Sequence, residues 1–264
     1  VSVRGGAQIY AFGQDLYKID TTGPALAIAE TVPMFDKGMN LLPFWDYAFD
    51  NGGVASINYY TEKYMGLLLV DQRTGAIDDV VLKGDPAMAY SVVLAPDRKR
   101  AYAVMDDLTV IDLVKKTYVT SVPVAEGTSY GVNVSSDGAK IYVGAGGATV
   151  TVYDARTLTS VWTYATPNFN PNHAYLVEDG KTLLVELGKD SAVLSDVAVA
   201  FDAATGATKW SVPLSASTSN HASYGGGRFL IALPEVTTAL DVATGKLLWT
   251  RPHSGTHGEL YSFV

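Results

Sequence analysis

Histidine is scarce in this chain, and three of its four histidines fall at matching places in a repeated pattern. His173, His221 and His257 lie in the segments NPNHAY, TSNHASY and GTHGELY, each of which leads into β-forming residues. Neutral imidazole nitrogens from neighbouring units can converge on a divalent metal that keeps one position open for water or substrate. The pattern predicts a candidate metal site, with ordinary loop histidines as the alternative.

Aromatic residues stand at the corresponding places elsewhere in the pattern. Tyr90, Tyr130 and Tyr261 lie in matching segments, where a tyrosine hydroxyl or ring face can contact a ligand. Trp45 and Asp46 lie in LLPFWDY, where a carboxyl group beside aromatic rings is a candidate base. These five residues are the predicted ligand-binding candidates. Packing around a narrow axis and loop capping are the alternatives.

A repeat that runs through the whole chain positions these residues. A β-rich segment that ends in Asp occurs six times, at Asp20, Asp71, Asp112, Asp154, Asp202 and Asp241. The intervals are 39 to 51 residues long and, counted through both chain ends, account for all 264 residues. One repeat reads SYGVNVS, AKIYVGA, ATVTVYD and TSVWTYA, which predicts four short strands. The prediction is an all-β, six-bladed β-propeller with four-stranded antiparallel blades, a single domain over residues 1–264.

Strands from both chain ends are expected to close the first blade. AQIYAFGQ, DLYKID and ALAIAETV match the second, third and fourth strands, and HGELYSFV supplies the first. Such closure avoids an exposed sheet edge. The segments on either side of Val264 and Val1 read together as one hairpin. Processing, permutation, engineering and arbitrary numbering remain open as explanations.

Composition excludes several classes of function. The absence of cysteine excludes disulfides, Cys-ligated metals, covalent haem attachment and a cysteine-linked quinone within this chain. A net charge of −8 argues against a nucleic-acid partner. No apolar run approaches the ~18 residues of a membrane span.

Two sets of segments resemble known propellers. AQIYAFGQDLYKID, LLPFWDYAFDNGGVASINYYTEKYMGLLLVDQRTG and SYGVNVSSDGAKIYVGAGGATVTVYDARTLTSV lie within residues 1–165. In this order they resemble the propeller subunit of quinohaemoprotein amine dehydrogenase and, more broadly, YVTN-type propellers. The resemblance implies a non-catalytic subunit, periplasmic or secreted, whose partner subunits carry haem and quinone. The chain departs from that family in having six predicted blades rather than seven.

The second set lies in residues 196–250. VAFDAATGATKW and TALDVATGKLLW resemble the repeat of pyrroloquinoline-quinone-type propellers. This resemblance implies that Trp210 and Trp249 pack between blades. It implies blade architecture rather than the quinone, so no intrinsic cofactor is expected apart from the candidate divalent metal.

Three functions follow from these patterns. The first is a non-catalytic propeller subunit that docks redox-cofactor-bearing chains. The second is a metal-dependent lyase or hydrolase that uses the three histidines. The third is a standalone secreted or engineered binding propeller. Intrinsic catalysis is left open.

Overall fold

The computed structural model of the chain is built from β-strands. It describes residues 8–12, 16–20, 22, 25, 27–32, 40–41, 48–49, 54–60, 65–71, 74, 76–81, 91–104, 106–124, 129–145, 149–166, 169–177, 180–189, 196–215, 222–233 and 235–252. Within these ranges lie 24 strands, and none of these residues belongs to a helix long and apolar enough to cross a membrane. The chain divides into two compact units, Val1–Ser121 and Val122–Val264.

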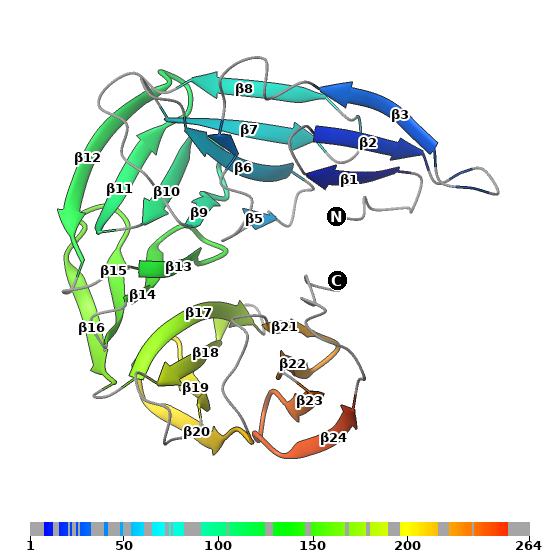
Figure 1. The fold of residues 1–264 in the computed structure, drawn as a ribbon. Helices are drawn as coiled ribbons and strands as arrows, with labels where there is room; N and C mark the ends of the chain where they lie inside the picture. Colours follow the sequence, from blue (N-terminus) through cyan, green and yellow to red (C-terminus); the bar gives the residue numbers. More distant parts are fainter. Residues whose placement is uncertain are drawn as a thin grey trace. The chain divides into compact units, whose positions relative to one another are not determined.

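The strands of the first unit form three sheets (Figure 1). The first sheet has the order β1 (Gln8–Phe12), β2 (Leu16–Asp20) and β3 (Ala27–Val32). The second has β6 (Val54–Tyr60), β7 (Met65–Asp71) and β8 (Ile77–Val81), and β6 also pairs with β4 (Asn40–Leu41) and β5 (Ala48–Phe49). The third has β9 (Ser91–Leu94), β10 (Arg100–Val104), β11 (Asp107–Asp112) and β12 (Thr117–Pro123).

The second unit has three four-stranded sheets, each in chain order (Figure 1). One contains β13 (Ser129–Val134), β14 (Lys140–Ala145), β15 (Thr149–Asp154) and β16 (Ser160–Ala165). The next contains β17 (Phe169–Val177), β18 (Thr182–Lys189), β19 (Val197–Asp202) and β20 (Thr208–Pro213). The last contains β21 (Ala222–Gly225), β22 (Arg228–Ala232), β23 (Val236–Asp241) and β24 (Leu247–Pro252).

These sheets confirm the all-β prediction and the four-strand repeat. The strands expected from SYGVNVS, AKIYVGA, ATVTVYD and TSVWTYA are β13 to β16. The three strands expected from the N-terminal segments are β1 to β3. The strand expected from HGELYSFV lies outside the described residues.

The repeated Asp organises the turn between the third and fourth strands. Asp154 Oδ1 accepts hydrogen bonds from the backbone N–H groups of Arg156 and Thr157, at 2.9 and 2.8 Å. The same carboxylate-to-backbone pattern recurs at Asp202 and Asp241. Because these bonds favour the ionised carboxylate, the hydrogen bonds from Thr157 lower the pKa of Asp154.

The fourth residue after Asp takes a left-handed backbone conformation. Gly206 and Gly245 have φ of 74° and 71° there, which glycine adopts without steric cost. The two repeats that lack the Thr-Gly pair place Lys116 and Leu158 at this position, with φ of 56° and 57°. The turn geometry is therefore kept even where the sequence signature is absent.

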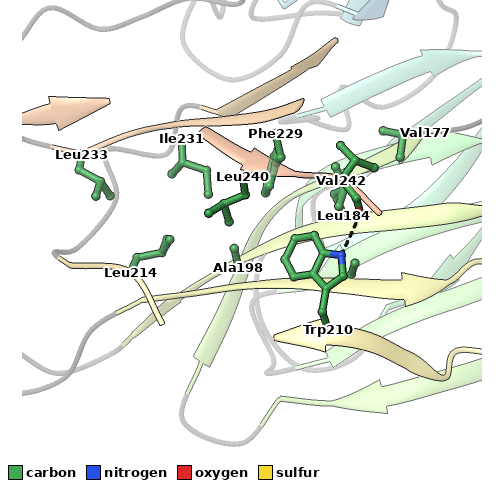
Figure 2. Close-up of a cluster of buried hydrophobic side chains, with 11 residues drawn as sticks. Val177, Leu184, Ala198, Trp210, Leu214, Phe229, Ile231, Leu233, Leu240 and Val242 are labelled. Carbon is green, nitrogen blue, oxygen red and sulfur yellow. Dashed lines mark hydrogen bonds between the residues drawn. The ribbon is translucent and has the colours of Figure 1, made fainter. Parts of the chain in front are cut away.

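Tryptophans from one sheet pack against the glycine turns of the next. The ring of Trp162 covers Gly206, where an added Cβ would lie 2.8 Å from Cδ2. The ring of Trp210 covers Gly245 in the same way, at 2.7 Å. Trp210 Nε1 also donates a hydrogen bond to the Val242 carbonyl oxygen at 2.8 Å (Figure 2). Glycine is required at both turns, because the indole occupies the space of a side chain.

Apolar side chains fill the space between neighbouring sheets. In Figure 2, Leu184 and Ala198 from one sheet pack with Phe229, Ile231 and other side chains from the next. A second cluster joins the sheet of β13–β16 to the sheet of β17–β20, and a third joins two sheets of the first unit. Sheets packed face to face through such clusters are the arrangement of propeller blades.

Candidate functional site

Most of the predicted site residues lie outside the described residues. The predicted site residues that lie outside the described ranges are Trp45, Asp46, Tyr90, His221, His257 and Tyr261. Tyr130 lies in β13 and His173 lies in β17, and for these two the structure describes the backbone. No group of three metal-binding side chains occurs within the described ranges.

The register of the sheets gives these positions a common reference. In each of the five repeats after the first, the Asp that ends the third strand pairs with a residue of the second strand: Val54, Arg100, Lys140, Thr182 and Arg228. Four residues further along the second strand lies a position that we call the rim level. It is occupied by Asn58, Val104, Gly144, Glu186 and Ala232.

The first strand of each sheet, which we call the innermost strand, is irregular at the rim level in two sheets. In β13 the register shifts between Ser129 and Gly131, so Tyr130 lies in the irregularity. In β17 the register shifts between Pro171 and Ala174, so His173 lies in the irregularity. Bulges bend a strand and redirect its side chains, and they are frequent beside active sites.

The second sheet carries a larger interruption at the same level. Leu41 in β4 pairs with Tyr59, and Ala48 in β5 pairs with Ser56, so both short strands lie along β6. The intervening residues 42–47 include Trp45 and Asp46. These residues lie outside the described ranges, between two short strands that pair with β6 on either side of the rim-level residue Asn58.

Two further candidates immediately precede an innermost strand. Ser91 begins β9 and pairs with Val104 at the rim level, so Tyr90 is the next residue towards the N-terminus. Ala222 begins β21 and pairs with Ile231. His221 precedes it in the sequence and, like Tyr90, lies outside the described residues. Of the sequence-predicted residues, Tyr130 and His173 lie in irregularities opposite the rim level of their sheets.

The described backbone brings two of these positions into neighbouring strands. The Asn133 side-chain amide in β13 donates a hydrogen bond to the Ala174 carbonyl oxygen in β17. A Cβ added at Gly144 would lie 3.2 Å from Pro171 Cβ, so the rim level of one sheet packs tightly against the next. Tyr130 and His173 therefore belong to adjoining innermost strands.

Glu186 is a rim-level residue that the sequence analysis missed. Its side chain is 0 % exposed, and it lies opposite the irregularity of β17 that contains His173. Val104, Gly144 and Ala232 hold the same level in other sheets, so a carboxyl group here departs from the repeat. Burying a carboxyl group costs free energy unless it is paired or hydrogen-bonded. Because the other aligned repeats have uncharged residues at this level, Glu186 is a candidate site residue. The signal was a lone charge within the apolar segment LLVELG.

Tyrosines support the start of β21, beside His221. The Tyr175 hydroxyl donates a hydrogen bond to the Ala222 carbonyl oxygen at 2.7 Å. The rings of Tyr175 and Tyr224 meet edge to face at 6.1 Å between centroids. Burial raises the pKa of the Tyr224 hydroxyl above its ordinary value. The first strand of this sheet is thus anchored from the preceding sheet.

A family comparison matches the part of the chain in which the tryptophan and glycine contacts recur. Residues 109–260 match the PQQ-repeat family model described as outer membrane protein assembly factor BamB. The chain belongs to the BamB-like PQQ-repeat family. This membership confirms the resemblance seen in residues 196–250 and makes the fold a β-propeller of PQQ-type repeats.

A solved structure and the curated proteins complete the comparison. The PQQ-repeat chain is similar to Kuenenia stuttgartiensis hydrazine synthase, with 19 % identity and a TM-score of 0.65. The match covers 81 % of this chain and 67 % of that one. At this identity the likeness establishes the fold alone. Among curated proteins, none matches significantly.

Proposed function

We propose that residues 1–264 form one closed six-bladed ring. The six sheets and the whole-chain repeat support six blades. Trp162 and Trp210 each cover the turn of the following sheet, and Trp249 holds the same repeat position in β24. In a closed ring, the turn after Asp20 is its counterpart. There Thr22 donates backbone and hydroxyl hydrogen bonds to Asp20 Oδ1, at 2.8 and 2.7 Å, in a turn whose threonine lies two residues after Asp rather than three.

This ring acts as a scaffold subunit that docks other chains. The observation that carries this proposal is the tryptophan-on-glycine packing, which fixes successive blades against one another and suits a rigid platform. The resemblance of residues 1–165 to the amine dehydrogenase propeller subunit indicates haem- and quinone-bearing partners. Because the chain has no cysteine, those groups would have to be attached to partner chains.

The proposed compartment is periplasmic or secreted. The matching family model is described as a factor of outer membrane protein assembly, which favours a location outside the cytoplasm. The absence of cysteine is compatible with either redox environment, so the family match carries this part of the proposal.

Purification of the tagged chain from cells that make it tests the scaffold function. We expect stoichiometric partner chains in the intact-mass spectrum, together with haem absorption in the visible spectrum. A monomer without such absorption would contradict the proposal. Such a monomer, if it bound a small ligand, would support a standalone binding propeller instead.

A metal-dependent lyase or hydrolase is the second candidate. It is favoured by the position of His173 in the irregularity of β17 and by the Asn-His-Ala tripeptide that His173 and His221 share in the sequence. With His257 they would bind a divalent metal, and Glu186 would lie close to the backbone of one ligand. Elemental analysis should then give one metal per chain, which His221→Ala removes. Absence of metal, or an unchanged metal content in that variant, would eliminate this candidate.

A further inference from the structure

Each described sheet ends in an outer strand whose far edge pairs with no other described strand. These outer strands are β3, β8, β12, β16, β20 and β24. An outer strand presents backbone N–H and C=O groups that can pair with another chain. Proteins usually block such edges with charged residues or proline.

Five of the outer strands carry such a block. Charged residues or prolines within them are Glu30 in β3, Asp78 and Asp79 in β8, Pro123 in β12, Lys209 and Pro213 in β20, and Arg251 and Pro252 in β24. These residues oppose the addition of a further strand by desolvation of charge or by loss of an N–H donor.

The strand β16 lacks both kinds of block. Its sequence is SVWTYA, and five of its six residues are exposed. Val161 is 48 % exposed and Tyr164 is 36 % exposed. Among the described sheets, β16 is therefore the outer strand whose composition favours pairing with another β-strand.

We propose that β16 is the docking edge for an extended segment of a partner protein. This inference rests on the scaffold function and names the surface that carries it. The occupant is a partner segment rather than a second copy of this chain, because each copy has a net charge of −8 and the copies repel one another. The partner segment is uncharged where it pairs and basic where it leaves the edge.

The geometry of β16 indicates which partner side chains fit. From Trp162 to Ala165 the strand pairs regularly with β15, and the register shift lies beside Val161. Alternation places Trp162 and Tyr164 on one face and Thr163 on the other. The Tyr164 ring packs against Phe201 at 4.6 Å between centroids, so it forms a fixed apolar platform. A partner residue opposite Tyr164 should be aromatic or β-branched.

A synthetic probe tests this docking edge in the full chain. The probe is the blocked peptide Lys-Val-Thr-Val-Thr-Val-Lys, and binding is followed by fluorescence anisotropy and backbone hydrogen exchange. We expect slower exchange confined to 160–165 and to the adjoining β15. Val161→Lys should weaken binding by about fivefold or more. Thr163→Lys, at a second exposed position, should have the same effect.

The matched control is Leu248→Lys in β24. Leu248 precedes Trp249 as Val161 precedes Trp162, and it is 43 % exposed. This variant should bind the probe as tightly as the parent chain. A probe methylated at alternate backbone nitrogens should not bind.

Several outcomes would overturn the docking edge. One is that Leu248→Lys weakens probe binding as much as Val161→Lys does. Another is that the probe slows hydrogen exchange on a different outer strand. A third is that the probe does not bind a chain whose circular dichroism shows native structure. A dimer seen by sedimentation that Val161→Lys dissolves would assign the edge to a second copy. Partner purification tests the scaffold function separately, because it does not depend on β16.

Discussion

The contact between Trp210 and Gly245 allows the packing between blades to be tested with a single methyl group. Gly245→Ala adds a Cβ to a residue with φ of 71°, at 2.7 Å from Trp210 Cδ2 and 2.9 Å from two further ring atoms. Gly227→Ala adds the same group at φ of 73°, where no heavy atom lies within 4 Å. The two substitutions differ in the indole contact and share the backbone strain.

The expected free energies of unfolding follow from that difference. A left-handed conformation costs an alanine roughly 1–2 kcal/mol, so the free energy of unfolding falls by this amount in both variants. Forcing a methyl group into an occupied space costs about 1–3 kcal/mol more, and of these two variants only Gly245→Ala has this additional loss of stability. Gly206→Ala should behave like Gly245→Ala, because its Cβ would lie 2.8 Å from the Trp162 ring at φ of 74°.

Urea denaturation followed by far-ultraviolet circular dichroism measures these losses on the full chain. We expect the midpoint to fall most for Gly245→Ala and Gly206→Ala and least for Gly227→Ala. Equal losses for all three would refute the indole contact as the element that fixes one blade against the next. Adding Trp210→Leu to Gly245→Ala removes the indole ring and should restore part of the stability lost to the clash. A thermal melt of the double variant measures this gain.

Three further predictions concern hydrogen bonds and titration. Trp210→Phe leaves the Val242 carbonyl oxygen without its donor and should lower the free energy of unfolding by about 1–3 kcal/mol. Trp162→Phe should lower it less, because Trp162 Nε1 has no hydrogen-bond partner among the described residues. Urea denaturation of the two variants measures the difference. The hydrogen bonds of the turn lower the pKa of Asp154 in the folded chain, so its contribution to stability is present above the unfolded-state pKa near 3.8 and is lost as the pH falls through the folded-state pKa. Asp154→Asn should therefore reduce the dependence of the unfolding midpoint on pH in the acid range. Burial raises the pKa of Tyr142 to about 12, so the stability that this tyrosine contributes is present below the unfolded value of 10.0 and is lost as the pH rises towards 12. Absorbance at alkaline pH should therefore show a late-titrating component that Tyr142→Phe reduces.

The repeat was predictable because its local chemistry is repeated in the sequence. Asp, Thr and Gly at fixed offsets define the turn between strands, and β-branched residues define the strands on either side. The left-handed residues Lys116 and Leu158 were harder to predict from the sequence, because their turns lack glycine. There the hydrogen bonds of the flanking strands hold non-glycine residues in a left-handed conformation, which local propensity disfavours.

The rim level was predictable only in part. The candidate tyrosines and histidines were found from their matching segments, but the irregular pairing around Tyr130 and His173 was not. Pro171 has no backbone N–H and interrupts the ladder of β17, an effect that depends on register and not on composition. The two-residue strands β4 and β5 are too short to leave a periodic signal.

Glu186 shows why a buried functional candidate can escape sequence analysis. It lies within an apolar run that reads correctly as a buried strand, and only alignment of the second strands reveals a carboxyl group at a position where the other aligned repeats have uncharged residues. Its burial depends on the next sheet, which local sequence does not specify.

Ring closure is tested most directly by cross-linking, because a chain without cysteine allows a thiol pair to be placed without background. Lys209 and Thr244 occupy the positions before Trp210 and before Gly245, so Lys209→Cys with Thr244→Cys is the control pair within a described sheet-to-sheet contact. The test pair is Leu248→Cys with Thr22→Cys, which precede Trp249 and Gly23 in the sequence as Lys209 and Thr244 precede Trp210 and Gly245. A closed six-bladed ring predicts that a short bis-maleimide joins both pairs within one chain at similar rates. Efficient cross-linking of the control pair without any in the test pair would contradict closure.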